Sequence, residues 1–178
     1  MEFTLKTVYD QKACTAMAKA ARKTLRKKRS HRVHIIGWIV IVIVLLLTLP
    51  LGNEAYVITA QTVFTWFITA VMLVALLFED HLNGFITKKR ILPGSANVTT
   101  VFTDENYTST TPIASTQWQY ETVAAIVEVD TYLAFFFSTS HAQIYDLRAI
   151  EGGTAEELKA FLTEKAGKRI QGLSKKQK

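Results

Sequence analysis

The sequence predicts an α+β membrane protein, in which a two-helix transmembrane hairpin precedes a small antiparallel β-sheet domain with a C-terminal helix. Two uncharged apolar stretches, residues 35–51 and 57–78, lie only five residues apart. Short segments of alternating hydropathy follow, and an amphipathic segment comes after them. Long apolar runs favour membrane helices, and strands followed by one helix favour a small α+β domain.

The arm at residues 1–33 is expected to hold a short strand and a basic helix. Residues 2–9 alternate loosely in hydropathy, which predicts the strand. Asp10 can cap a helix that starts at Gln11, because its carboxylate can accept hydrogen bonds from free backbone amides. We expect this helix to continue into the first span as a basic stem, in preference to lying along the membrane, because its apolar stripe has few large side chains. The stripe consists of Cys14, Met17, Ala18, Ala21 and Leu25.

The hairpin is assigned to residues 34–80, with spans at 35–51 and 57–78. Crossing a hydrocarbon core about 30 Å thick takes roughly 20 helical residues. The two runs contain 17 and 22 residues, and residues 40–47 have no polar position on any face. A pair of buried helices in a soluble core fits less well, because such helices usually keep a polar stripe. A cleaved signal peptide also fits less well, because more than thirty residues precede the first run.

The distribution of basic residues predicts that both termini are cytoplasmic in a multi-pass cell-membrane protein. Residues 1–34 contain ten lysines and arginines, and the connecting residues 52–56 contain none. Basic residues are retained on the cytoplasmic side during insertion. The net charge of +6 in a tethered chain points to anionic lipids of the inner leaflet, not to nucleic acid. The plainer alternative is that these residues only fix topology. The predicted membrane-surface residues are Arg22, Lys23, Arg26, Lys27, Lys28, Arg29, Arg32, Lys88, Lys89 and Arg90.

The second span carries a polar strip formed by Gln61, Thr65 and Thr69 on one helix face. A membrane-embedded amide often marks a helix–helix contact, so the strip is a candidate docking site. The alternative is that Gln61 bonds locally near the interface and the threonines bond to their own helix. Neither span contains a charge, which argues against a channel or transporter unless many copies assemble. A second copy of the chain is a further candidate partner.

After a stalk at residues 81–95, a β-rich domain is predicted at residues 96–166. We expect residues 2–9 to add a strand to its sheet, because about eighty residues are few for an independent core. A capping box of Thr154 and Glu157 begins the C-terminal helix, and the basic tail at 167–178 is expected to fray. The expected strands are residues 97–103, 107–111, 124–129, 132–137 and 143–147.

The residues that carry chemistry in enzymes do not form a recognisable constellation here, so we expect no enzyme, no cofactor and no metal. His31 and His34 are three apart, but the neighbouring arginines disfavour a cation there. The single cysteine, Cys14, excludes an internal disulfide. The aromatic residues at 132–137 are expected in the core. If the sheet packs against the leaflet, Phe135 or Phe137 would face the membrane.

The order of elements and several packing residues resemble the YcxB-like membrane proteins, which are found mainly in Gram-positive bacteria. This resemblance covers most of the chain and implies a C-terminal domain similar to pleckstrin-homology-like (PH-like) domains, with no established activity to carry over. The family often has a proline at a strand end where this chain reads Ile144 to Leu147. The residues that carry the resemblance are 102–105, Tyr107, 118–121, Val123, 126–128, 132–137, Leu158, Phe161 and Leu162.

The expected function is that of a non-enzymatic integral membrane protein. Its cytoplasmic PH-like domain would bind a partner protein or the anionic inner leaflet, in a regulatory role. Two alternatives stay open: self-protection against a membrane-active peptide, and an accessory subunit of a membrane transporter. An enzyme acting on lipid or nucleotide is less favoured, because no convergent set of titratable side chains can be assembled.

Overall fold

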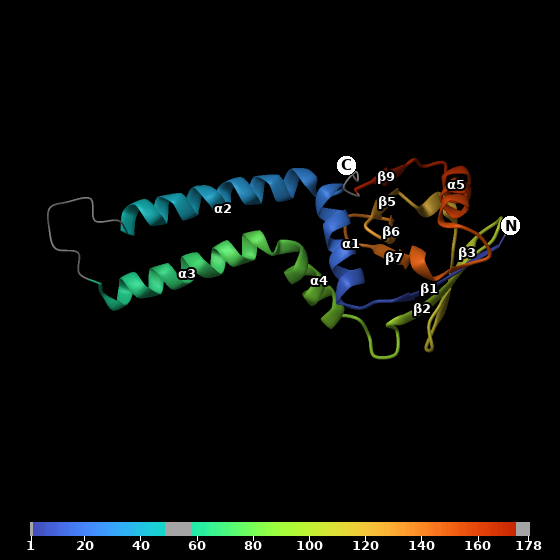
Figure 1. Ribbon diagram of the computed structural model, residues 1–178, viewed down its shortest axis with the longest axis horizontal. Coiled ribbons are helices and arrows are strands. Elements are labelled where there is room, and N and C mark those ends of the chain that lie inside the picture. Colours follow the sequence, from blue (N-terminus) through green and yellow to red (C-terminus); the bar gives the residue numbers. More distant parts are fainter. Residues whose placement is uncertain (1, 49–57, 174–178) are drawn as a thin grey trace. The chain divides into compact units, whose positions relative to one another are not determined.

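The computed structural model describes residues 2–48 and 58–173, which form five α-helices and nine strands (Figure 1). The helices are α1 (Gln11–Lys23), α2 (Lys27–Thr48), α3 (Ala60–Leu77), α4 (Glu79–Lys89) and α5 (Ala155–Ala166). The strands are β1 (Phe3–Val8), β2 (Asn97–Phe102), β3 (Tyr107–Thr110), β4 (Ser115–Trp118), β5 (Ala125–Val129), β6 (Tyr132–Phe136), β7 (Ala142–Asp146), β8 (Ile150–Glu151) and β9 (Ile170–Gly172).

The chain divides into two compact units. The helix unit is Lys27–Glu79 and contains α2 and α3. The sheet unit consists of the described residues before and after it, up to Arg26 and from Asp80 onward. The helix unit is therefore an insertion between the first strand of the sheet unit and all its other strands.

A five-stranded antiparallel sheet has the order β4-β3-β2-β1-β8. Strand β1 pairs with β2 in a register that runs from Phe3 opposite Phe102 to Val8 opposite Asn97. On its other side β1 pairs with β8. The expectation that the first residues complete the sheet of the C-terminal domain is confirmed.

A second, four-stranded sheet has the order β7-β6-β5-β9, in which β9 runs parallel to β5. All five residues of β6 are buried, so both faces of this sheet are covered. Leu133 and Phe135 pack on one face, in a core shared with the first sheet and α5. Ala134 and Phe136 pack on the other face, against α1.

Aromatic side chains dominate the core between the two sheets. The ring of Phe102 lies 5.2 Å from that of Tyr107 and 5.3 Å from that of Tyr145. Helix α5 closes this core, because its Phe161 lies 5.4 Å from Phe3 of β1. The predicted capping box of Thr154 is present at the start of α5. Stacked, edge-on and tilted aromatic pairs of this kind add about 1 kcal/mol each beyond their buried area.

Helix α1 covers the outer face of the second sheet with small residues. Asp10 caps it as expected, since its side chain accepts from the amide of Ala13. Ala13, Ala16 and Ala20 are buried against the sheet. The stem prediction is wrong, because α1 ends at Lys23 and the turn at residues 24–26 separates it from α2. The buried face also differs from the predicted stripe, of which only Cys14 is buried, while Leu25 is exposed and follows the end of α1.

Three further expectations need correction. The sequence predicts one sheet, whereas the described residues form two, and the short strands β4, β8 and β9 were not expected. The tail was expected to fray, but Gly167 ends α5 with a positive φ of 60° and turns the chain back, so that residues 170–172 pair with β5. The stalk contains helix α4.

The aromatic residues of β6 do not face outward. Phe135 is fully buried in the core between the sheets. Phe137 is half-buried and stacks on Trp118, with 4.7 Å between the ring centres. The alternative in which Phe135 or Phe137 faces the membrane is therefore wrong. The first sheet and α5 cover one face of the second sheet, and α1 covers the other.

In the helix unit, α2 and α3 run side by side (Figure 1). They approach closely at Gly37, where an added Cβ would lie 2.8 Å from a methyl carbon of Leu76. Of the large apolar side chains in α2 and α3, only Ile41 is buried. Both helices are long and apolar enough to cross a membrane. The predicted connecting turn, Pro50 and the outer ends of both spans lie outside the described residues.

Buried tyrosines give the sheet unit a pH dependence. Burial raises the pKa of Tyr9 to about 12, although the amide of Ile144 donates to its hydroxyl and lowers the pKa in part. Burial likewise raises the pKa of Tyr107, Tyr120 and Tyr145. In the unfolded chain these groups ionise near pH 10. Their contribution to stability is complete below that pH and is lost as the pH rises through the folded-state values.

We therefore predict that the free energy of unfolding falls above about pH 10. The slope is about 1.4 kcal/mol per pH unit for each tyrosine that ionises only in the unfolded chain. Denaturant unfolding at a series of pH values, followed together with tyrosinate absorbance, measures it. Tyr145→Phe should reduce the slope by one tyrosine's share. Ionisation of the core tyrosines before the sheet unit unfolds would contradict the prediction.

Candidate functional site

Arg22 of the predicted basic surface has a structural contact. Its Nε and Nη2 donate to the two carboxylate oxygens of Asp80, each at 2.6 Å. This pair joins the last turn of α1 to the first turn of α4, and the side chains are only 29% and 17% exposed. A bidentate pair with so little solvent fixes geometry well. Arg22 is thus less available to a lipid than its neighbours.

The next basic residues lie where α1 ends. Lys23 is exposed in the last turn of α1, where a cation complements the helix dipole. Arg26 is also exposed, and its Nε and Nη2 donate to the carbonyl of Thr139 in the β6–β7 loop at 3.1 and 2.5 Å. Arg26 therefore connects the turn that follows α1 to the β6–β7 loop of the second sheet.

Four predicted residues occupy the first turns of α2, in the helix unit, and all four are exposed. They precede the apolar part of the helix, which starts at Ile35. Long basic side chains in this position can extend along the helix toward headgroups. The four residues are Lys27, Lys28, Arg29 and Arg32.

The last three predicted residues, Lys88, Lys89 and Arg90, are exposed at the end of α4. Eight residues of helix, about 12 Å, separate Lys88 from Asp80, the partner of Arg22. Lys89 extends over the ring of Phe85, with its Nζ 4.6 Å from the ring centre. Within the sheet unit the predicted membrane-surface residues therefore form two groups, one at the end of α1 and one at the end of α4.

The polar strip on α3 is largely satisfied by its own helix. The hydroxyl of Thr65 donates to the carbonyl of Gln61 at 2.9 Å, and that of Thr69 donates to the carbonyl of Thr65 at 2.8 Å. Bonding of this kind is the local alternative for threonine. Gln61 is exposed, so its amide is the polar group that the strip offers to a neighbouring helix.

The two histidines that are three apart in the sequence have different surroundings. His31 is exposed. The Nδ1 of His34 lies 3.6 Å from a carboxylate oxygen of Glu79, which also accepts from Ser30 at 3.1 Å. This contact joins the start of α2 to the residues after α3. Among residues 2–48 and 58–173, no three His, Cys, Asp or Glu side chains gather as metal ligands.

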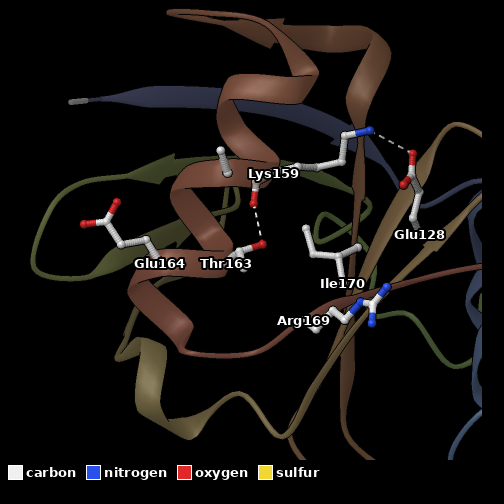
Figure 2. Close-up of a pocket in the computed structure, with 7 residues that line it drawn as sticks. Glu128, Lys159, Thr163, Glu164, Arg169 and Ile170 are labelled. Atoms are coloured by element: carbon white, nitrogen blue, oxygen red, sulfur yellow. Dashed lines mark hydrogen bonds and ion pairs between the residues drawn. The ribbon is translucent and has the colours of Figure 1, made fainter.

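A groove of about 580 Å³ lies beside α5, at the edge of the second sheet. Figure 2 shows Lys159 reaching from α5 to Glu128 on β5, while Glu164 points away from them. The Lys159 amine lies 3.1 Å from Glu128 and 3.4 Å from Glu156. The groove is lined by Glu128, Lys159, Ala160, Thr163, Glu164, Arg169 and Ile170.

Two polar residues that line the groove, Lys159 and Thr163, are engaged in contacts of their own. Burial lowers the pKa of Lys159, but the hydrogen bonds and charges of Glu128 and Glu156 outweigh it and leave the pKa raised. A lysine that stays protonated cannot act as a nucleophile or a general base. The hydroxyl of Thr163 donates to the Lys159 carbonyl at 2.7 Å, which occupies it within the helix.

Sequence reasoning missed this groove. Its residues come from β5 and, about 30 to 40 residues later in the sequence, from α5 and the segment around β9. The pairing of Lys159 with Glu128 depends on the parallel β9–β5 pairing and on the position of α5, and no local spacing reveals either.

In comparisons with family models, with curated proteins and with solved structures, nothing matches this chain. The resemblance to YcxB-like proteins therefore stays a prediction.

We predict that the Arg22–Asp80 pair stabilises the sheet unit, because removing one partner leaves the other charge poorly solvated. Asp80→Asn should lower the free energy of unfolding by about 1 to 3 kcal/mol. A double-mutant cycle with Arg22→Gln, read by thermal unfolding of the full chain, gives the coupling between them. The matched control is the exposed Lys6–Glu151 pair, at 2.6 Å, where the coupling should be below about 1 kcal/mol. Equal coupling in the two cycles would contradict the prediction.

Proposed function

We propose that this protein is a non-enzymatic integral membrane protein that holds its α+β domain against the anionic cytoplasmic leaflet of the cell membrane. The carrying observation is the helix unit, in which two helices of 22 and 18 residues expose most of their large apolar side chains. At about 1.5 Å per residue, α3 extends about 27 Å, and the apolar part of α2, from Ile35 to Thr48, extends about 21 Å. A hydrocarbon core is about 30 Å thick, and in the sequence the apolar run of α2 continues past Thr48 to Leu51.

The direction of insertion follows from the basic residues on either side of the helix unit. Lys27, Lys28, Arg29 and Arg32 precede the apolar part of α2, and Lys88 to Arg90 follow α3. Residues 52–56 contain no base. The positive-inside rule then favours a cytoplasmic position for both ends of the hairpin and for the sheet unit.

The same residues supply the affinity for lipid. Each base close to an anionic leaflet contributes on the order of 1 kcal/mol. The four bases of α2 are exposed and adjacent to the span along the chain, so they reach headgroups wherever α2 leaves the bilayer. Arg22 and Arg26 contribute less to the affinity for lipid in this proposal, because their guanidinium groups bind other parts of the sheet unit.

A binding role is favoured over catalysis by the state of the reactive groups. Burial raises the pKa of the Cys14 thiol, and buried thiols are poor nucleophiles. Lys159 is held as a cation by its carboxylate partners. The groove beside α5 would then serve as the place where the tethered domain receives a protein partner. The PH-like nature of the domain, which the resemblance to YcxB-like proteins implies, belongs to the same proposal.

The experiment compares the preference for phosphatidylglycerol over phosphatidylcholine in full-length protein, using spin-labelled lipids of both kinds in reconstituted vesicles. The wild type should prefer phosphatidylglycerol several-fold, since four bases lie next to the span. The variant K27Q/K28Q/R29Q/R32Q should lose most of that preference.

The matched control is K6Q/K165Q, which removes bases of β1 and α5 that are far from the spans along the chain. It should keep the preference of the wild type. If wild type, control and quadruple variant all bind the two lipids equally, the proposal fails.

A further inference from the structure

Helix α4 is attached to the sheet unit along one face. Gly84 is buried against α1, where an added Cβ would lie 2.5 to 2.8 Å from Thr15 atoms that include its backbone nitrogen and Cα. Asp80, one turn earlier, binds Arg22. The side-chain amide of Gln11 donates from Nε2 to the backbone carbonyl of His81 at 3.2 Å. Because Gly84 has no side chain, the backbones of α4 and α1 come into close contact there.

The opposite face of α4 is apolar and exposed. Leu82, Phe85 and Ile86 are 42%, 48% and 46% exposed. With 100° of rotation per residue, Leu82 and Ile86 point about 160° away from Gly84, and Phe85 about 100° away. Three large apolar side chains at this spacing form a continuous stripe, and such a stripe marks a contact with lipid or with another molecule.

The position of α4 in the chain indicates what covers the stripe. Only Phe78 separates the end of α3 from the start of α4. If α3 crosses the bilayer, α4 begins at the bilayer surface. An 11-residue helix is about 16 Å long, so none of its residues can be far from that surface.

The charges at the end of α4 fit the same surface. Lys88, Lys89 and Arg90 follow the apolar stripe directly, and Lys89 extends over Phe85, one of its members. Interfacial helices combine large apolar side chains with basic residues in this way, since the former enter the acyl boundary and the latter meet anionic headgroups.

We propose that α4 is an interfacial helix that lies on the anionic leaflet, with Leu82, Phe85 and Ile86 at the acyl boundary and Lys88, Lys89 and Arg90 among the headgroups. The inference rests on the proposed function, because it needs α3 to cross the membrane. It adds an orientation of the sheet unit to the proposed function. Because Gly84 and Asp80 attach α4 to α1, an α4 that lies on the bilayer holds α1 and the sheets in one orientation relative to it. A lipid surface is favoured over a protein partner because chain connection alone brings it to the stripe.

The test places an environment-sensitive fluorophore (NBD) on single cysteines of full-length Cys14→Ala protein in lipid nanodiscs that hold one copy each. Leu82→Cys and Ile86→Cys carry the label on the stripe. Asn83→Cys places it on the flank of the same helix, and Glu105→Cys places it in the exposed β2–β3 turn. All four side chains are exposed, so the substitutions leave the packing of the sheet unit intact.

In discs containing phosphatidylglycerol, the labels at 82 and 86 should shift to shorter emission wavelengths and resist quenching by aqueous iodide. The label at 105 should stay fully quenchable, and that at 83 should be intermediate. The variant K88Q/K89Q/R90Q should lose much of the shift at 86. Phosphatidylcholine discs should likewise give a smaller shift than phosphatidylglycerol discs.

Labels at 82 and 86 that are as quenchable as the label at 105 would overturn the inference. A shift that appears only in discs with two copies would also overturn it, in favour of a second chain on the stripe. These failures are distinguishable from failure of the proposed function. If the proposed function fails, the chain does not enter discs, or the spin-labelled lipids show no preference, whatever the labels on α4 report.

Discussion

Along α2 and α3 most large apolar side chains are exposed, because each of two helices side by side can cover only the facing side of the other. Water is a poor surrounding for such a surface, at about 25 cal/mol for each Å² of apolar area. Hydrocarbon removes that cost, and helices satisfy their own backbone groups in it. If the two helices lie in hydrocarbon, both ends of the helix unit emerge on one side. The sheet unit must then fold across the insertion, as the pairing of β1 with β2 and the Arg22–Asp80 contact allow.

Much of the fold follows from local rules. The apolar runs predict two long helices, the alternation at Phe3 and Leu5 predicts β1, and hydroxyl and carboxylate positions predict the caps at Asp10 and Thr154. What local rules miss depends on partners far along the chain. The sequence singles out a stripe through Cys14 and Met17, whereas the face that the second sheet buries runs through Ala13, Ala16 and Ala20. Strand β9 has no pattern of its own and takes its form from the free edge of β5.

The candidate site shows the same division. Residue type and position predict the bases around the spans, but sequence cannot tell an arginine that binds Asp80 from a lysine that stays exposed. The stripe of Leu82, Phe85 and Ile86 is visible in the sequence at helical spacing. It gains meaning only when Gly84 places the opposite face against α1. The groove beside α5 depends on β9 and has no local pattern at all.

The most direct measurement is the depth of Trp66, an exposed residue of α3. The full chain with Trp38→Phe and Trp118→Phe retains Trp66 as its single tryptophan, and the matched protein retains only Trp118 of the sheet unit. Both are reconstituted in vesicles whose lipids are brominated along the acyl chains. The account predicts strong quenching of Trp66 and little of Trp118. A Trp66 that bromine leaves unquenched and aqueous iodide quenches would contradict it.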